Sequence, residues 1–313
     1  MTHALIFPGQ GSQAVGMGKD LADAFPEAKA VFEQVDDALG QNLSEIMFEG
    51  PEDQLTLTEN TQPALMAMSM AIMAVLESRH GFNIGSQATC VAGHSLGEYS
   101  ALAAAKAFGL ADTARLLKSR GKSMQVAVPV GEGAMAAVLG IEMDVAEAIA
   151  AEAAQSEVCT AANDNAPGQI VLSGATAAIE RAVEIAKEKG AKRSILLPVS
   201  APFHCAMMAP AADVMADELA AIDIQIPAVP IVANVTAAST SDPAQIRSLL
   251  VEQVTSRVRW RECILAMKDM GVTTFVEVGA GKVLTGMIRR IDSDLSGVSV
   301  QSLEDIEAFA ASL

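Results

Sequence analysis

The segment Gly93–Gly97 reads Gly-His-Ser-Leu-Gly and fits the pattern G-x-S-x-G, in which a serine occupies a sharp turn between a buried strand and a helix. A compact apolar run over Thr89–Ala92 precedes it, and helical periodicity resumes at about Glu98. Flanking glycines permit the tight turn, and free N–H groups at a helix start can stabilise a developing oxyanion. The pattern predicts that Ser95 is a nucleophile; the alternative is an ordinary turn serine.

A serine hydroxyl is a weak nucleophile at neutral pH and needs an adjacent base. The sequence contains four histidines. His3 lies near the N-terminus, and His80 ends a predicted surface helix. The side chain of His94 should leave the turn in a different direction from that of Ser95, which favours a packing role. His204 follows a predicted strand end near a domain boundary, so by elimination it is the best candidate for the base.

Three other features could take part in chemistry. Arg120 lies toward the end of a helical stretch, where it is either a solvated side chain or a guanidinium that grips a substrate carboxylate. Cys205 is an alternative nucleophile, although nothing marks it as a thiolate. The Gly-rich segment Phe7–Gln13 lacks the lysine and the spacing of a P-loop. A tight turn that brings one backbone N–H to the serine suits it better.

The elements that must position these residues follow an α/β pattern. A strand at Leu5–Phe7 leads into the Gly-rich loop, and a buried helix contains Ala64–Leu76, with Thr61 as its expected N-cap. From about residue 129 to 199 the order becomes strand, helix, strand, strand, helix, strand, which is the split ferredoxin-like unit. Its expected elements are Ala134–Leu139, Asp144–Ala154, Val158–Ala162, Gln169–Ser173, Ala177–Lys189 and Ser194–Val199.

The α/β pattern returns after this insertion, with strands expected at Ile231–Val235, Thr274–Val278 and Val298–Gln301. We therefore expect an α/β fold with a large domain formed by residues 1–128 and 200–313. A small domain formed by residues 129–199 is inserted into it.

Composition excludes several classes of function. The 313-residue chain has a formal net charge of −17, which argues against nucleic acid as a partner. Its four cysteines form no CxxC pair and match no common zinc pattern, so we expect reduced thiols, no bound metal and a cytoplasmic location. The N-terminus lacks the features of a signal peptide, and the apolar run Ala64–Leu76 is shorter than the roughly 20 residues of a membrane span.

Several of these segments together closely resemble the malonyl-CoA:acyl carrier protein transacylases of type II fatty acid synthesis, which look related to the acyltransferase domains of polyketide synthases. They run almost end to end, in the order of the family. The matching segments are Phe7–Gln13, Thr61–Ala64, Gly93–Glu98, Ser119–Gly121, Asn163–Gly174, Val199–His204, Gln253, Val258–Trp260 and Glu277–Gly279.

The resemblance implies an α/β-hydrolase-like large domain with a ferredoxin-like insert. It also implies transfer of a malonyl group from malonyl-CoA to acyl carrier protein through a malonyl-serine, without a metal or a redox cofactor. The residues that the resemblance assigns are Ser95 as nucleophile, His204 as base, the backbone N–H groups of Leu96 and Gln10 as oxyanion hole, Arg120 as holder of the malonyl carboxylate, and Gln253 as the residue that orients His204 through a carbonyl.

The chain departs from the family at two positions. Asp164 stands where the family often has tyrosine, and Val258 where it often has proline before Arg-Trp. We expect the first to alter the pocket rim or a domain contact and the second to be a local backbone matter. Phe203, before the histidine, resembles the malonyl-selective version of this segment in polyketide acyltransferases.

Three alternatives remain beside this interpretation. They are a serine thioesterase, a noncatalytic module that binds carrier protein, and an excised polyketide acyltransferase domain. The position of the motifs favours a complete free-standing enzyme, and the resemblance favours a monomer. The acidic carrier protein could dock on one of three basic islands, around Lys187–Arg193, Arg257–Arg261 or Lys282–Arg290.

Overall fold

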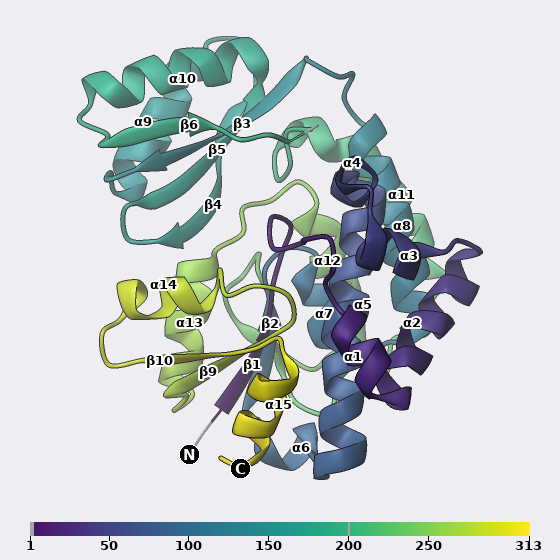
Figure 1. Ribbon diagram of the computed structural model, residues 1–313. Coiled ribbons are helices and arrows are strands. Elements are labelled where there is room, and N and C mark those ends of the chain that lie inside the picture. Colours follow the sequence, from purple (N-terminus) through teal and green to yellow (C-terminus); the bar gives the residue numbers. More distant parts are fainter. Residues whose placement is uncertain (1–2, 200) are drawn as a thin grey trace.

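The computed structural model describes residues 3–199 and 201–313, and it is a mixed α/β structure with two separate sheets (Figure 1). The larger sheet has the strand order β10-β9-β1-β2-β7-β8, in which every neighbouring pair is parallel except β7 and β8. Its strands are β1 (His3–Phe7), β2 (Cys90–Gly93), β7 (Ile231–Val232), β8 (Ser239–Thr240), β9 (Thr274–Val278) and β10 (Ser296–Val300).

Helices cover both faces of this sheet. Leu5 and Phe7 of β1 belong to one core cluster, together with residues of α5 (Thr58–His80), whereas Ala4 and Ile6 belong to another, together with residues of α13 (Trp260–Asp269). A strand buried on both faces is apolar at every position, which explains why β1 is recognisable as a short apolar run. The other helices of this six-stranded unit are α1 (Lys19–Ala24), α2 (Pro26–Leu39), α3 (Leu43–Glu49), α4 (Glu52–Thr56), α6 (Ile84–Gln87), α7 (Gly97–Ala104), α8 (Leu110–Val126), α11 (Ala209–Ala220), α12 (Pro243–Gln253), α14 (Thr285–Ile291), α15 (Leu303–Ala310) and the short 3-10 helix η1 (Ala206–Met208).

The expected start of the long buried helix was wrong. Thr61 does not cap α5 but lies inside it, because the helix already begins at Thr58. The Thr61 side chain is fully buried, and its hydroxyl donates a hydrogen bond to the Leu55 carbonyl at 2.6 Å. It therefore satisfies a carbonyl of the segment before the helix and does not cap the helix. We also expected the helix that ends at His80 to lie on the surface, but most of its residues are buried.

The second sheet forms a four-stranded unit with two helices, and its chain order confirms the predicted β-α-β-β-α-β arrangement. The strand order is β4-β5-β3-β6, with antiparallel pairs throughout. The last strand ends at Leu196, earlier than expected, and it lies at the sheet edge, as Pro198 indicated. The elements are β3 (Gly133–Leu139), α9 (Met143–Ala154), β4 (Cys159–Ala166), β5 (Gln169–Ala175), α10 (Thr176–Glu188) and β6 (Arg193–Leu196).

The two faces of the small sheet have different neighbours. Ala136 and Val138 pack with α9 and α10, whereas Met135 and Val171 belong to the same core cluster as the six-stranded unit. The face without helices is therefore turned toward the large sheet, and Figure 1 shows the chain crossing between the two units beside it. Ser200, at the expected return to the large domain, lies outside the described residues. No helix within residues 3–199 and 201–313 is long and apolar enough to cross a membrane.

Candidate active site

Ser95 occupies the turn between β2 and α7 in a left-handed conformation, with φ 54°. Both flanking glycines are needed for close packing: a Cβ on Gly93 would lie 1.9 Å from the carbonyl carbon of Gly97, and one on Gly97 would lie 2.3 Å from the Phe7 oxygen. Asn234 holds the turn from outside, because its Oδ1 accepts from the Ser95 N–H at 2.8 Å and its Nδ2 donates to the Gly93 carbonyl at 2.8 Å. The strand, the turn and the helix thus present the hydroxyl as the motif predicted.

His204 meets this hydroxyl, with Nε2 at 2.8 Å from Ser95 Oγ. The other ring nitrogen, Nδ1, lies 2.9 Å from the backbone carbonyl of Gln253. A carbonyl only accepts hydrogen bonds, so Nδ1 carries the proton and Nε2 is left to accept the serine proton. Burial, and then the nearby charge of Arg120, lower the pKa of His204 to about 3. The imidazole is therefore neutral near pH 7, as a base must be.

Arg120 enters the same site from α8, with only 1% of its surface exposed. The solvated-side-chain alternative is thus wrong. Its Nη1 donates to Gln62 Oε1 at 2.9 Å, and its Nη2 donates to Ser95 Oγ at 3.1 Å and to Gln253 Oε1 at 2.8 Å. Burial lowers the pKa of Arg120, but a guanidinium remains charged in proteins. A buried cation that lies over the Tyr99 ring and donates its hydrogen bonds to neutral oxygens is suited to bind a substrate anion.

Two backbone N–H groups lie unpaired beside the serine. Within the described residues, neither the Leu96 nor the Gln10 N–H donates a hydrogen bond to another protein group. Leu96 follows Ser95 at the start of α7, and Gln10 lies in the loop after β1; both line the cavity that contains Ser95. Free N–H groups in such places are the usual components of an oxyanion hole.

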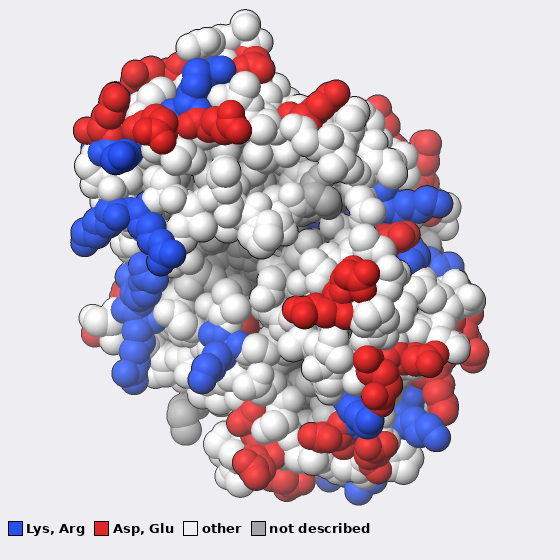
Figure 2. All heavy atoms as spheres, turned by 45° about the horizontal axis from the view of Figure 1, so that its top comes forward, with Lys and Arg blue, Asp and Glu red and all other residues white. Residues whose placement is uncertain are grey.

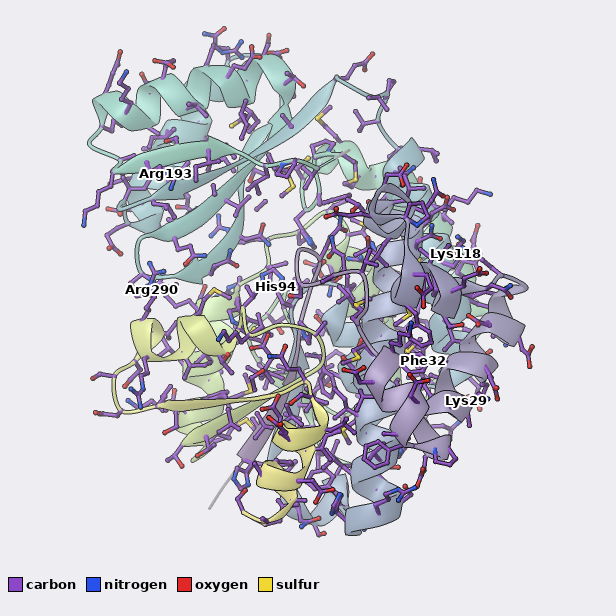
Figure 3. The ribbon with its side chains drawn as sticks, viewed as in Figure 1. Lys29, Phe32, His94, Lys118, Arg193 and Arg290 are labelled. Atoms are coloured by element: carbon purple, nitrogen blue, oxygen red, sulfur yellow. The ribbon has the colours of Figure 1, made fainter. Side chains whose placement is uncertain are left out.

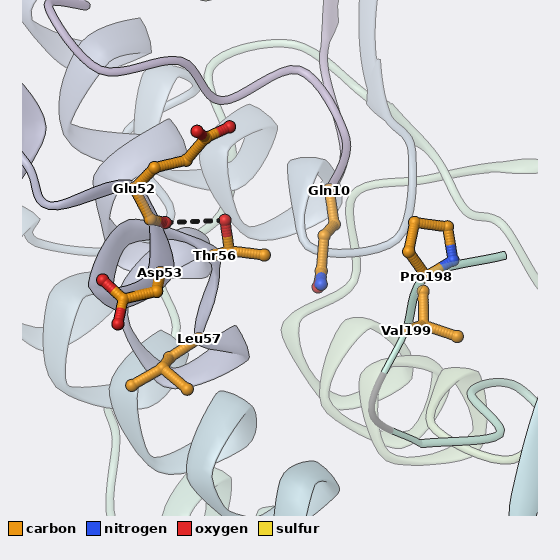
Figure 4. A pocket seen from close by; sticks show the side chains of 7 residues that line it. All are labelled: Gln10, Glu52, Asp53, Thr56, Leu57, Pro198 and Val199. Atoms are coloured by element: carbon orange, nitrogen blue, oxygen red, sulfur yellow. Dashed lines mark hydrogen bonds between the residues drawn. The ribbon is translucent and has the colours of Figure 1, made fainter.

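The cavity around Ser95 has a volume of about 450 Å³ and is walled by both units. Met135, Asn163 and Val171 come from the small sheet, and Phe203 comes from the connection to the large one. The mouth of the cavity continues into the pocket shown in Figure 4, and the two share five lining residues. These shared residues are Gln10, Glu52, Thr56, Pro198 and Val199.

His94 and Cys205 were the weaker candidates for the base and the nucleophile, and the structure places neither in that role. His94 lies at the junction of the two units (Figure 3), where its Nε2 is 2.9 Å from Asn165 Oδ1 and its ring packs near Trp260. This supports packing, although His94 also lines the cavity. Cys205 is buried, burial raises the pKa of its thiol, and its Sγ donates to the Pro202 carbonyl at 3.1 Å, so the geometry gives no thiolate.

The sequence interpretation gave no role to three buried residues that surround Ser95 on the protein side. They are polar side chains with 3% exposure or less, namely Gln62, Glu98 and Asn234. The available signal was their position: Gln62 lies two residues before the apolar run of a buried helix, and Glu98 lies directly after the G-x-S-x-G turn. Within the described residues, no group of three or more His, Cys, Asp or Glu side chains could hold a metal ion.

The two departures from the family pattern meet at one contact between the units. The Val258 N–H donates to the Ala162 carbonyl at 2.8 Å, and the Asp164 N–H donates to the Val258 carbonyl at 3.0 Å. The first bond requires an N–H that proline lacks. The Asp164 carboxylate is 2% exposed and pairs with Arg261 of α13, with Nη2 to Oδ2 at 2.8 Å. Asp164 therefore acts in the contact between the units.

Comparisons with known proteins agree with this geometry. Residues 4–303 match the acyl transferase domain family. The chain is 44% identical to the malonyl CoA-acyl carrier protein transacylase of Bacillus subtilis over 97% of this chain and 95% of the relative. It is 43% identical to the Escherichia coli K12 protein of the same name, over 99% of this chain and 98% of the relative.

Solved structures give the same result. The acyl-carrier-protein-S-malonyltransferase of Bartonella henselae is 55% identical, with a TM-score of 0.98 over 100% of this chain and 99% of that one. A malonyl-transacylase solved in complex with a type II PKS acyl-carrier protein is 40% identical, with a TM-score of 0.96 over 100% of both chains. With a serine, a neutral histidine and a buried arginine in one cavity, and with relatives this similar over nearly their whole length, the chain belongs to the malonyl CoA-acyl carrier protein transacylase family of acyl transferases.

Proposed function

We propose that the protein transfers a malonyl group from malonyl-CoA to the phosphopantetheine thiol of holo-acyl carrier protein and so supplies malonyl-acyl carrier protein for fatty acid biosynthesis. The observation that carries the proposal is the direct contact of Ser95 Oγ with both His204 Nε2 and Arg120 Nη2. One atom is thereby adjacent to a base and to a fixed cation. An acyl group that also bears a carboxylate fits this pair.

The reaction proceeds in two matched halves. His204 takes the Ser95 proton while the hydroxyl attacks the malonyl thioester, and the oxyanion that forms is held by the Leu96 and Gln10 N–H groups. The intermediate collapses with loss of coenzyme A, whose sulfur receives the proton from His204. The carrier-protein thiol then attacks the malonyl-serine and reverses these steps. The thioester and the ester are already activated, so the residues present suffice without a metal or a redox cofactor.

Arg120 gives the selectivity in this proposal. Its Nη1 has a second N–H beyond the bond to Gln62, and its Nη2 already reaches Ser95 Oγ. A carboxylate at the far end of the acyl group accepts from the guanidinium with charge-assisted hydrogen bonds. With an acetyl group the cation keeps only its neutral partners, and this difference favours malonyl.

We infer that the large unit is an α/β-hydrolase-like domain of residues 1–128 and 200–313, and that residues 129–199 form an inserted ferredoxin-like domain. The strand order β4-β5-β3-β6 with two helices on one face supports the second assignment. The cytoplasmic location and the monomeric state stay predictions.

We infer that carrier protein docks on the basic residues at the junction of α14 with the small sheet. Of the three predicted islands, ion pairs within the protein set apart the one at Arg257–Arg261, and in the Lys187–Arg193 island Lys189 pairs with Glu152. Arg257, Arg259 and Arg261 are each paired with an acidic side chain of the protein itself. By contrast, within the described residues Lys282, Arg289 and Arg290 form no ion pair, and the one side-chain partner of Arg290 is the neutral Gln169, so their charge is available to a partner.

The four-stranded sheet places a basic residue of the small unit near the basic residues of α14. Arg290 Nη1 donates to Gln169 Oε1 at 3.0 Å, and the register pairs Leu139 with both Gln169 and Arg193. Arg193 is thus about two strand spacings, roughly 10 Å, from the residue that Arg290 contacts. Figure 3 shows Arg193 and Arg290 on the same side of the molecule, and Figure 2 shows Lys and Arg side chains gathered along that side. An acidic carrier protein fits such a column of charge.

The function is tested by incubating the protein with malonyl-CoA and holo-acyl carrier protein and measuring malonyl-acyl carrier protein by mass spectrometry. Malonyl-acyl carrier protein that forms only when the protein is present supports the proposed transfer. Release of free malonate with no malonyl-acyl carrier protein would instead identify a serine thioesterase. A noncatalytic binding module would bind carrier protein and give neither product. Holo carrier proteins of fatty acid and polyketide type, compared in the same assay, separate the two pathways.

A further inference from the structure

Glu98 is a buried carboxylate one helical turn from the nucleophile, and the reaction described above does not use it. It lies in the first turn of α7 and is 2% exposed. Its Oε2 accepts two hydrogen bonds, from the Asn234 backbone N–H at 3.0 Å and from Gln253 Nε2 at 2.8 Å. Within the described residues it forms no ion pair. Burying a carboxylate that is held only by neutral donors costs free energy, so we expect this residue to serve a function.

Gln253 is the residue through which Glu98 reaches the site. Its backbone carbonyl lies 2.9 Å from His204 Nδ1. Its side-chain amide is used separately: Nε2 donates to Glu98 Oε2 and to the Ser95 carbonyl, at 2.8 and 3.0 Å, and Oε1 accepts from Arg120 Nη2 at 2.8 Å. The main chain of Gln253 thus serves the base, whereas its side chain serves the cation.

The identities of the two neighbours determine how this amide is turned. A carboxylate accepts hydrogen bonds and a guanidinium donates them, so the NH₂ end must face Glu98 and the oxygen must face Arg120. A turned amide would place an NH₂ group against the guanidinium and an oxygen against the carboxylate. Without an acceptor at Glu98, only the Ser95 carbonyl and Arg120 itself favour this orientation of the amide, so Gln253 holds Arg120 less firmly.

We propose that Glu98 is a positioning residue for substrate selection: it holds the Gln253 side-chain amide so that Oε1 anchors Arg120 beside Ser95. This inference rests on the proposed role of Arg120. It assigns two separate tasks to Gln253, and it places the control of selectivity in a residue, Glu98, that does not touch the substrate. Glu98 is predicted to matter for malonyl transfer and little for transfer of an acyl group that lacks a carboxylate.

Three substitutions at Glu98 test the proposal by acylation of Ser95 with malonyl-CoA and with acetyl-CoA, each followed by rapid-quench mass spectrometry. Glu98→Ala removes the acceptor. Glu98→Asp keeps the charge but withdraws the carboxylate by one methylene. Both should lower the malonyl-to-acetyl preference by about tenfold to a hundredfold, because the cation is no longer fixed. Glu98→Gln keeps an oxygen within reach of Gln253 Nε2 and should restore most of the preference.

The matched control is Glu277→Gln in β9. Glu277 is also fully buried and accepts from two backbone N–H groups, but these belong to Leu284 and Thr285 at the start of α14 and not to Gln253. It should leave the preference unchanged. Equal losses with both substrates in Glu98→Ala and Glu98→Asp, or unchanged preference in both, would overturn the proposal.

A double-mutant cycle tests the route through the glutamine. If Glu98 acts through Gln253, the effects of Glu98→Asp and Gln253→Leu on the preference should not add. Additive effects would overturn the route. Wild type is measured in parallel: if it takes up no malonyl group, the proposed function fails, whereas normal wild-type acylation with an unaltered preference in the variants refutes only the role of Glu98.

Discussion

Ser95 Oγ and His204 Nε2 lie 2.8 Å apart, and both residues have a left-handed backbone, with φ 54° and 59°. Residues other than glycine seldom adopt this conformation, and it persists only where surrounding contacts hold it. At Ser95 those contacts come from Asn234, and at His204 from the carbonyl of Gln253. The Ser95 hydroxyl and the His204 imidazole are therefore placed by backbone turns before any substrate arrives.

Replacing the base should slow acylation without preventing folding around the site. We expect His204→Ala to lower the rate of Ser95 acylation by about 10² to 10⁴-fold, the range found for loss of a positioned base. The measurement is single-turnover mass spectrometry with malonyl-CoA. A variant that acylates at the wild-type rate would contradict the assignment of His204.

The low pKa of His204, about 3, also predicts a pH profile. Its folded pKa is below the ordinary value, so the base form persists as the pH falls from 8 to about 5. The rate of acylation by acetyl-CoA, which does not involve the carboxylate clamp, should therefore stay nearly constant over this interval. A fall centred near pH 6.5 would show that the histidine titrates normally and is not buried in this way.

Removing the guanidinium should change selectivity more than rate. Arg120→Ala removes a charge-assisted bond to the malonyl carboxylate, worth about 1.5 to 3 kcal/mol, and should lower the preference for malonyl over acetyl by roughly 10 to 100-fold. The matched control is Arg115→Ala on the same helix, since Arg115 is 54% exposed and pairs with Asp112. Comparable losses in both variants would mean that general charge, and not Arg120, sets the preference.

The buried carboxylate of Glu98 should cost stability as the pH rises. Burial raises its pKa from 4.5 to about 7, although Asn234, Gln253 and Arg120 oppose the shift. Because the folded pKa lies above the unfolded one, its contribution is fully present below about pH 4.5 and is lost as the pH rises through 7. Glu98→Gln does not titrate, so wild type should lose about 3 kcal/mol relative to this variant between pH 4.5 and 8.

Urea unfolding of both proteins across this pH range measures the difference. Curves for wild type and Glu98→Gln that run parallel with pH would contradict a raised pKa. A difference of opposite sign would mean that the folded protein stabilises the charged carboxylate, as a strong ion pair would do.

Charge reversal should separate the two halves of the reaction. We expect Arg289→Glu with Arg290→Glu to slow transfer to acyl carrier protein and to leave acylation by malonyl-CoA unchanged, because the carrier protein is the acidic partner. The slowing should diminish at high salt, where exposed charges are screened. Lys29→Glu, on the opposite side of the molecule in Figure 3, is the control. Equal rates of transfer to acyl carrier protein in wild type, the Arg289→Glu/Arg290→Glu variant and Lys29→Glu would exclude this docking surface.

Much of the site was predictable because the chemistry restricts residue types. Ser95 could be found from the glycines on each side, and His204 from the small number of histidines. Strands β1, β2 and β9 were recognisable because both of their faces are buried. The expected bounds were wrong at β7, which ends at Val232, and at the largely exposed β10, which begins at Ser296; β8 was not predicted. The small unit could be predicted from its alternation of strands and helices, although β6 ends earlier than its apolar run suggested.

What the sequence could not show is how distant polar residues meet. Asn234 and Ser95 are 139 positions apart, and nothing local marks the asparagine as the residue that holds the turn. The two uses of Gln253 depend on the three-dimensional placement of Glu98 and Arg120. The start of α5 was missed because Thr61 resembles a cap, whereas its buried hydroxyl bonds to the preceding segment.

The most direct test is intact-protein mass spectrometry after brief mixing of wild type and Ser95→Ala with malonyl-CoA. We expect a malonyl adduct on wild type and none on Ser95→Ala. An adduct of equal yield on Ser95→Ala, or none on wild type while carrier protein is still malonylated, would contradict the malonyl-serine intermediate on which the whole account depends.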